Sequence, residues 1–190
     1  MRMRGFVASL LVLAAAALAR ADVRTLVFTP DPADMHDLDH HSVYEWGIDV
    51  DLEAGESVLA AELRFENIAN WDDGDNVLYT HLLDWAEAGV TDVYYDDQAD
   101  EDYFDTLYQG TQTPLVTYVN LPSTGQDLIY GFSDDEVAAL NDYLADERIG
   151  IGIDPDCHFY NDGISLVVTV PEPTGALLLG LGVLAAVRRR

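Results

Sequence analysis

Apolar and polar residues alternate along several short segments of this chain. Between Val43 and Leu52, apolar side chains occupy every second position with acidic residues among those between, and residues 58–66 repeat the pattern. A period of two places successive side chains on opposite faces of a strand, so each segment is expected to bury one face. Short segments of similar character predict further strands at residues 24–28, 77–83, 115–120, 127–132, 149–153 and 164–170.

One segment follows a helical pattern instead. Ser133 and Glu136 have the spacing of a capping box, in which each side chain bonds the other's backbone N–H. Three apolar residues then follow on one helical face: Val137, Leu140 and Leu144. Many short strands with one short helix predict a mainly β fold, and we expect an antiparallel, jelly-roll-like β-sandwich.

The N-terminus has the pattern of a secretory signal peptide. Arg2 and Arg4 precede an apolar run over residues 6–17, and Ala19 and Ala21 supply small residues before a cleavage site. We therefore expect residues 1–21 to be removed before Asp22. The alternative, an uncleaved membrane anchor, is disfavoured because the apolar run is short for a bilayer.

The C-terminus has the pattern of a second targeting signal. Residues 175–187 are apolar and form the expected transmembrane helix. Two prolines before this segment prevent a helix from continuing back into the domain, and arginines after it favour the cytoplasmic side. The apolar segment is preceded by the motif Pro171, Glu172 and Pro173 and followed by Arg188, Arg189 and Arg190.

This tail resembles the PEP-CTERM sorting signal, which is also labelled the ice-binding protein C-terminal domain. The resemblance covers residues 171–190 and implies that the chain is held in the inner membrane and then cut by an exosortase. It implies release to the cell surface or the extracellular matrix, with the secretion machinery, the exosortase and exopolysaccharide as partners. An ordinary C-terminal anchor is the alternative. We expect three regions: signal peptide 1–21, an acidic domain 22–169 and sorting signal 170–190.

The charge of the central domain indicates which classes of partner it can bind. Residues 22–169 hold 34 acidic and three basic residues, a formal charge of −31. Such a surface repels phosphate backbones, so we expect no nucleic-acid partner. It also repels itself unless cations screen it, which favours either a solvated surface or specific Ca²⁺ binding. Cys157 is the single cysteine, so no disulfide can form within the chain.

Two segments carry candidate metal ligands. His36 and His40 are four positions apart and could hold a divalent metal if their segment were helical, although Pro30 and Pro32 disfavour a helix at its start. A solvated acidic loop is the alternative. The second segment offers oxygen ligands for Ca²⁺, or else forms a tight turn: Asp154, Asp156, Asn161 and Asp162.

Nothing in the sequence marks a catalytic site. Cys157 and His158 are adjacent, so on extended chain they point to opposite faces and cannot act as a nucleophile and its base. Trp46 is expected in the core, whereas Trp71 and Trp85 border loops and could stack on sugars. We therefore expect a non-enzymatic structural or adhesive domain. The alternatives are a carbohydrate-binding module and a hydrolase with two converging carboxylates.

Overall fold

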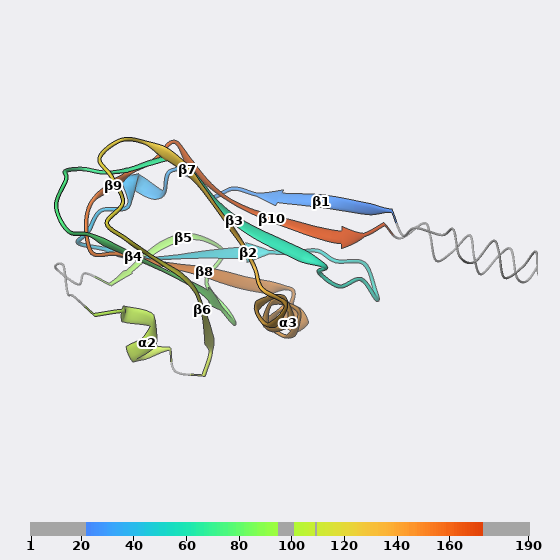
Figure 1. Ribbon diagram of the computed structural model, residues 1–190. Coiled ribbons are helices and arrows are strands. Elements are labelled where there is room, and N and C mark those ends of the chain that lie inside the picture. Colours follow the sequence, from blue (N-terminus) through green and yellow to red (C-terminus); the bar gives the residue numbers. More distant parts are fainter. Residues whose placement is uncertain (1–21, 95–100, 109, 173–190) are drawn as a thin grey trace, which may run out of the picture. The chain divides into compact units, whose positions relative to one another are not determined.

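The structure is a computed structural model, and it describes residues 22–94, 101–108 and 110–172. Ten strands and a few short helices make up this part of the chain (Figure 1). In order along the chain they are β1 Val23–Phe28, η1 Met35–Asp37, β2 Val43–Asp49, β3 Ala60–Asn70, β4 Val77–Leu83, β5 Gly89–Tyr94, α2 Tyr103–Leu107, β6 Gln112–Val119, β7 Gln126–Gly131, α3 Asp134–Tyr143, η2 Leu144–Asp146, β8 Arg148–Pro155, β9 Phe159–Tyr160 and β10 Gly163–Pro171.

The strands form two antiparallel sheets. The first sheet has the order β1-β10-β3-β7, with the short β9 paired to one end of β3. The second has the order β5-β2-β8-β4-β6 (Figure 1). The prediction of a mainly β fold is confirmed. Each strand expected from the alternating and apolar segments is present, with ends that differ by a few residues.

Both sheets contribute to one hydrophobic core. From the first sheet come Leu63 and Phe65 on β3 and Leu166 on β10, all fully buried. From the second come the alternating side chains of β2 and β8, among them Trp46 and Ile151. The period of two along these strands is therefore what assigns one face of each sheet to the core. Trp46 is a core residue, as the sequence predicts.

The outer face of the second sheet is also covered. Phe104 of α2 is fully buried and packs with Val43 and Leu83, which point away from the main core. Gly152 on β8 makes room for it, because a Cβ there would lie 2.6 Å from Cζ of Phe104. Figure 1 shows α2 on the side of the second sheet that faces away from the first. This arrangement buries polar side chains of the central strands under α2.

Helix α3 begins as the sequence predicts. The Ser133 hydroxyl accepts from Glu136 N at 3.3 Å, and the Glu136 carboxylate accepts from Ser133 N at 2.6 Å. The same carboxylate accepts from the Tyr130 hydroxyl at 2.7 Å, which ties the helix to β7. Burial raises the pKa of Tyr130 to about 12. The hydrogen bond to Glu136 and the charge of the Glu136 carboxylate contribute to this rise. Leu140 is fully buried and anchors the helix in the core.

Some predicted features lie outside the described residues. These are the signal peptide with Ala19 and Ala21, the apolar segment 175–187, and the tail residues Pro173, Arg188, Arg189 and Arg190. Within the described ranges, no helix combines the length and apolar character needed to cross a bilayer.

Residues Thr25–Val170 form one compact unit, which holds both sheets. The described residues Asp22–Arg24 and Pro171–Glu172 belong to a second unit. Within this second unit, Glu172 N donates to Asp22 O at 2.7 Å, so the two ends of the described chain meet.

Candidate functional site

The first part of the site is the segment between β1 and β2. Met35 and Leu38 are fully buried, which fixes this segment onto the core. Residues 35–38 all have positive φ angles, so the chain turns in the left-handed sense at four consecutive positions. Residues other than glycine rarely adopt this conformation, and it costs about 1–2 kcal/mol per residue. Because this is not an α-helix, the spacing of His36 and His40 does not place them on one helical face.

Asp39 directly follows this turn and is held by several hydrogen bonds. Asp39 N donates to the Tyr44 hydroxyl at 2.9 Å, and Asp39 Oδ1 accepts from His41 N at 3.0 Å and pairs with His41 Nδ1 at 2.9 Å. Partial burial raises the pKa of Asp39, but the hydrogen bonds with His41 and the charges of His40 and His41 lower it by more. The net result is a pKa below the ordinary value, so the carboxyl group stays ionised.

The second part of the site comes from the segment between β8 and β10. Phe159 N donates to Leu38 O at 3.3 Å, and Asn161 Nδ2 donates to Asp34 O at 2.9 Å. On its other side this segment is fixed by Trp71 N, which donates to His158 O at 3.0 Å. The two segments that the sequence marks as separate metal candidates are therefore packed against each other.

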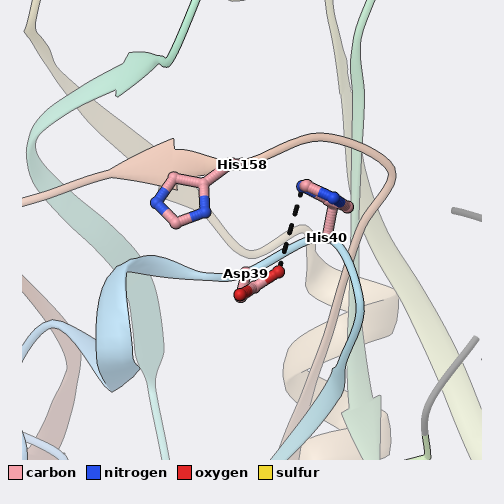
Figure 2. A group of neighbouring side chains, drawn as sticks. All are labelled: Asp39, His40 and His158. Atoms are coloured by element: carbon pink, nitrogen blue, oxygen red, sulfur yellow. Dashed lines mark ion pairs between the residues drawn. The ribbon is translucent and has the colours of Figure 1, made fainter. Parts of the chain in front are cut away.

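This packing brings Asp39, His40 and His158 into one group (Figure 2). One potential ligand atom of each lies within 4.8 Å of the others. His40 Nδ1 is 3.9 Å from Asp39 Oδ1, and the ring centroids of His40 and His158 are 6.3 Å apart. All three side chains are partly exposed. The group can offer two imidazole nitrogens and one carboxylate oxygen to a single ion.

A pocket of about 460 Å³ borders this group. It is lined by His36, Asp39, Ser42, Tyr44 and Val90. Asp39 belongs both to the pocket lining and to the ligand group. His36, in contrast, is exposed on the pocket wall and is not part of the group with His40.

The four candidate Ca²⁺ ligands have different surroundings. Asp154 is fully buried on β8, and its Oδ2 accepts from Tyr103 N at 2.9 Å beside α2. Asn161 contacts the segment before β2 through its bond to Asp34, and Asp162 Oδ2 accepts from Asn67 Nδ2 at 3.0 Å. Asp156 is half-buried in the turn after β8. The structure does not gather the four side chains into one group.

Cys157 and His158 also face different surroundings. Cys157 is buried, and its Sγ accepts from Trp71 Nε1 at 3.2 Å. The His158 ring lies 4.8 Å from the Tyr160 ring, measured between centroids. The two side chains therefore contact different neighbours.

A second polar cluster lies under α2, on the outer face of the second sheet. His81 on β4 is 1 % exposed. Its Nδ1 lies 2.7 Å from Gln112 Oε1, and its Nε2 lies 2.9 Å from Asp102 Oδ2. Asp102 also accepts at Oδ1 from Phe104 N and Asp105 N, and so caps α2 at its N-terminus. The cluster therefore connects the sheet to the helix.

The hydrogen bonds determine the protonation of His81. Gln112 Nε2 donates to Asp105 Oδ1 at 3.0 Å, so the amide oxygen of Gln112 faces His81 and His81 Nδ1 must donate to it. Nε2 faces a carboxylate, which only accepts, so it donates as well. Burial lowers the pKa of His81, but the hydrogen bonds with Asp102 and Gln112 and the charges of Asp102 and Asp105 raise it by more. We interpret the cluster as an internal ion pair.

A tyrosine–carboxylate pair lies on the same face. The Tyr108 hydroxyl donates to Glu45 Oε1, and Glu45 is buried. Burial and the neighbouring Glu45 carboxylate raise the pKa of Tyr108 well above its ordinary value. Sequence reasoning missed this face of the molecule. The available signals were His81 within an apolar strand and the spacing of Asp102 and Asp105, which suits a helix N-terminus.

The sequence matches no family model and no curated protein. Among solved structures, it is similar to latent aurone synthase (polyphenol oxidase) from its natural source, with a TM-score of 0.34 and 9% identity over 80% of this chain. The recombinantly expressed form of that protein aligns with a TM-score of 0.38 and 9% identity over 72% of this chain. In both cases the match spans 25% of the other chain. TM-scores in this range do not establish a shared fold, and nothing about function follows from them.

Proposed function

We propose that this chain is an exported bacterial protein of the PEP-CTERM kind, with a non-enzymatic structural or adhesive domain. A signal peptide directs it to the secretion machinery, and the C-terminal tail holds it transiently in the inner membrane. An exosortase then removes the tail, and the domain acts at the cell surface or in the extracellular matrix. Exopolysaccharide is its proposed partner there.

One observation carries this proposal. The Pro171-Glu172-Pro173 motif, an apolar segment and three terminal arginines occur in that order at the end of the chain. The bounds of the folded part support it: every described strand lies between Val23 and Pro171. Removal of residues 1–21 and of the tail beyond Glu172 would spare all of these strands.

The strand order supports a more detailed proposal for the fold. We propose that the two sheets form a jelly-roll sandwich around their shared core. In such a fold each sheet is built from strands distant in sequence, because the chain crosses between the sheets. The pairing of β10 with both β1 and β3, and of β8 with both β2 and β4, has this character.

Mass spectrometry of the protein recovered from its source culture, fraction by fraction, tests the export proposal. We expect a polypeptide in the surface or matrix fraction that begins at Asp22 and lacks residues 175–190. Replacement of Arg188, Arg189 and Arg190 by serine should weaken retention of the precursor in the inner membrane, since the arginines keep its C-terminal end on the cytoplasmic side. A full-length chain in the cytosol would overturn the proposal.

A second candidate function is carbohydrate binding, which one observation favours. Trp71 and Tyr160 are 57% and 51% exposed and lie on neighbouring segments, since Trp71 N bonds to His158 O and Tyr160 pairs with Ala69. Exposed aromatic rings can cover the apolar faces of sugars. Trp85 is also 57% exposed, but it lies in the connection between β4 and β5.

Retention on immobilised polysaccharides tests this second function. If the aromatic surface beside β9 binds glycans, Trp71→Ala and Tyr160→Ala should reduce retention of the chain. Trp85→Ala is the matched control, because it removes an equally exposed tryptophan elsewhere and should leave retention unchanged. Absence of retention on every polysaccharide tried, or equal loss in all three variants, would reject this candidate.

A further inference from the structure

Four of the five histidines of the chain lie in the two segments that meet beside β9. His36, His40 and His41 belong to the segment before β2, and His158 to the segment before β9. His81 lies on the far face of the second sheet under α2. In the described part of the chain, Asp39, His40 and His158 are the group that combines two histidines with a carboxylate at ligand distance.

We propose that Asp39, His40 and His158 form a binding site for one divalent transition-metal ion of the Zn²⁺ class. This site does not rest on the export proposal, and it adjoins the proposed glycan surface, since the His158 ring lies 4.8 Å from the Tyr160 ring. Two imidazole nitrogens and one carboxylate oxygen are ligands that Zn²⁺, Co²⁺ and Ni²⁺ accept, whereas Ca²⁺ and Mg²⁺ take oxygen ligands. Three protein ligands leave at least one coordination position for water or another molecule.

The separation of the ligand atoms suits a shared ion. With metal–ligand bonds of about 2.0–2.1 Å, two ligand atoms of one Zn²⁺ lie at most about 4 Å apart. The present atoms lie within 4.8 Å of one another, and Asp39 Oδ1 and His40 Nδ1 already lie 3.9 Å apart. The group is therefore close to the spacing that one shared ion requires.

The backbone around these ligands is fixed by other contacts. The bond from Phe159 N to Leu38 O joins the residues that directly adjoin His158 and Asp39. Leu38 and Phe159 are both fully buried, so this connection is anchored in the core. The ligands are thus held near one another by packing, and binding does not require the two segments to find each other.

His41 has a supporting role in this site. It holds Asp39 Oδ1 through both its backbone N–H and its ring nitrogen, and so fixes the orientation of the carboxylate beside His40. Such partners orient a metal ligand, and their loss weakens metal binding by about 10- to 100-fold. The strongly acidic domain adds to this by raising the local concentration of cations.

Isothermal titration of the full chain with Zn²⁺, at pH 7.5 and about 0.15 M salt to screen the acidic surface, tests the proposal. We expect one Zn²⁺ per chain. His40→Ala and His158→Ala should each weaken binding by at least about 10-fold, and Asp39→Asn should do the same without loss of volume. His41→Ala should also weaken binding, but by less than the loss of either histidine ligand. Co²⁺ titration gives a second readout, because its visible absorption reports coordination by nitrogen ligands.

His36→Ala is the matched control. His36 is the partner that sequence spacing gives to His40, but the structure places it outside the group, so its loss should leave the Zn²⁺ affinity unchanged. Thermal melts without metal establish that each variant is folded. Absence of stoichiometric binding, unchanged affinity in the His40 and His158 variants, or equal loss in the His36 variant would overturn the proposal. Ca²⁺ at the same concentration should not compete; full competition would also overturn it.

Discussion

His81 Nε2 donates to Asp102 Oδ2 at 2.9 Å, and the same carboxylate caps the N-terminus of α2. A buried charge on the sheet thereby holds the helix that covers it. Asp105 and Gln112 complete the surroundings of His81, while Glu45 and Tyr108 form a separate pair on the same face. The protonation state of one histidine is thus coupled to the docking of α2.

This coupling predicts how stability depends on pH. A histidine whose pKa is raised by folding adds stability that is complete below its unfolded pKa of about 6.5 and is lost as the pH rises through its folded pKa. We expect the free energy of unfolding to fall as the pH rises above about 6.5 and through the raised pKa of His81. His81→Gln should be less stable at pH 6 and should lack this slope, whereas the exposed His36→Gln should keep it. Urea titrations at several pH values provide the measurement, and an unchanged slope in His81→Gln would contradict the assignment.

Gly152 gives a second prediction, about the packing of Phe104. A Cβ at position 152 would lie 2.6 Å from Phe104 Cζ, so Gly152→Ala should push α2 off the sheet. Overpacking of this kind costs about 1–3 kcal/mol. Gly131→Ala is the control, because a Cβ at that position meets no atom within 4 Å. Chemical denaturation of both variants checks this; equal stability of the two would show that Phe104 moves aside without cost.

The capping box of α3 gives a third prediction. Ser133→Ala removes the hydroxyl that accepts from Glu136 N and should lower the stability by about 1 kcal/mol. Ser57→Ala, at an exposed position in the turn before β3, should have little effect. Thermal melts of the two variants at neutral pH would reveal the difference. A Ser133 variant as stable as the Ser57 variant would mean that Glu136 holds the helix start by itself.

The acidic surface gives a fourth prediction. With 34 acidic and three basic residues in the domain, the folded chain repels itself, so the melting temperature should rise with NaCl concentration. A specific Ca²⁺ site formed by Asp154, Asp156, Asn161 or Asp162 would add a further rise with Ca²⁺ at matched ionic strength. Because the structure gives Asp154, Asn161 and Asp162 different hydrogen-bond partners, we expect Ca²⁺ to act through screening alone. A melting temperature that rises more with Ca²⁺ than with NaCl at the same ionic strength would contradict this.

Local patterns were enough to predict most elements of the fold. Strand β4 spans the residues that the sequence predicts, because a short run of apolar and β-branched side chains bounded by polar turns is typical of a strand. Helix α3 was equally predictable from Ser133 and Glu136. In contrast, α2 is not predicted, because a helix of five residues is too short to show a helical period. Its stability comes from Phe104, whose contacts with Val43 and Leu83 are distant in sequence.

The candidate metal centre, in contrast, could not be predicted from local sequence patterns. Both segments that form it contain metal ligands predicted from the sequence. The predicted pair is His36 and His40, because these residues would share one face of a helix. Positive φ angles at residues 35–38 remove that spacing. His40 instead lies beside His158, a neighbour that only the packing of β9 against the segment before β2 provides. Contacts between segments so distant along the chain leave no mark in local periodicity.

The hydrogen bond between Glu172 and Asp22 has a consequence for the architecture of the chain. A short peptide that joined these two residues would close the domain into a ring without disturbing any strand. New ends could then be opened at an exposed turn such as the one at Gly55, which gives a circularly permuted protein with the same core. For the same reason the domain could be placed as an insert within a loop of another protein, since it enters and leaves at a single point.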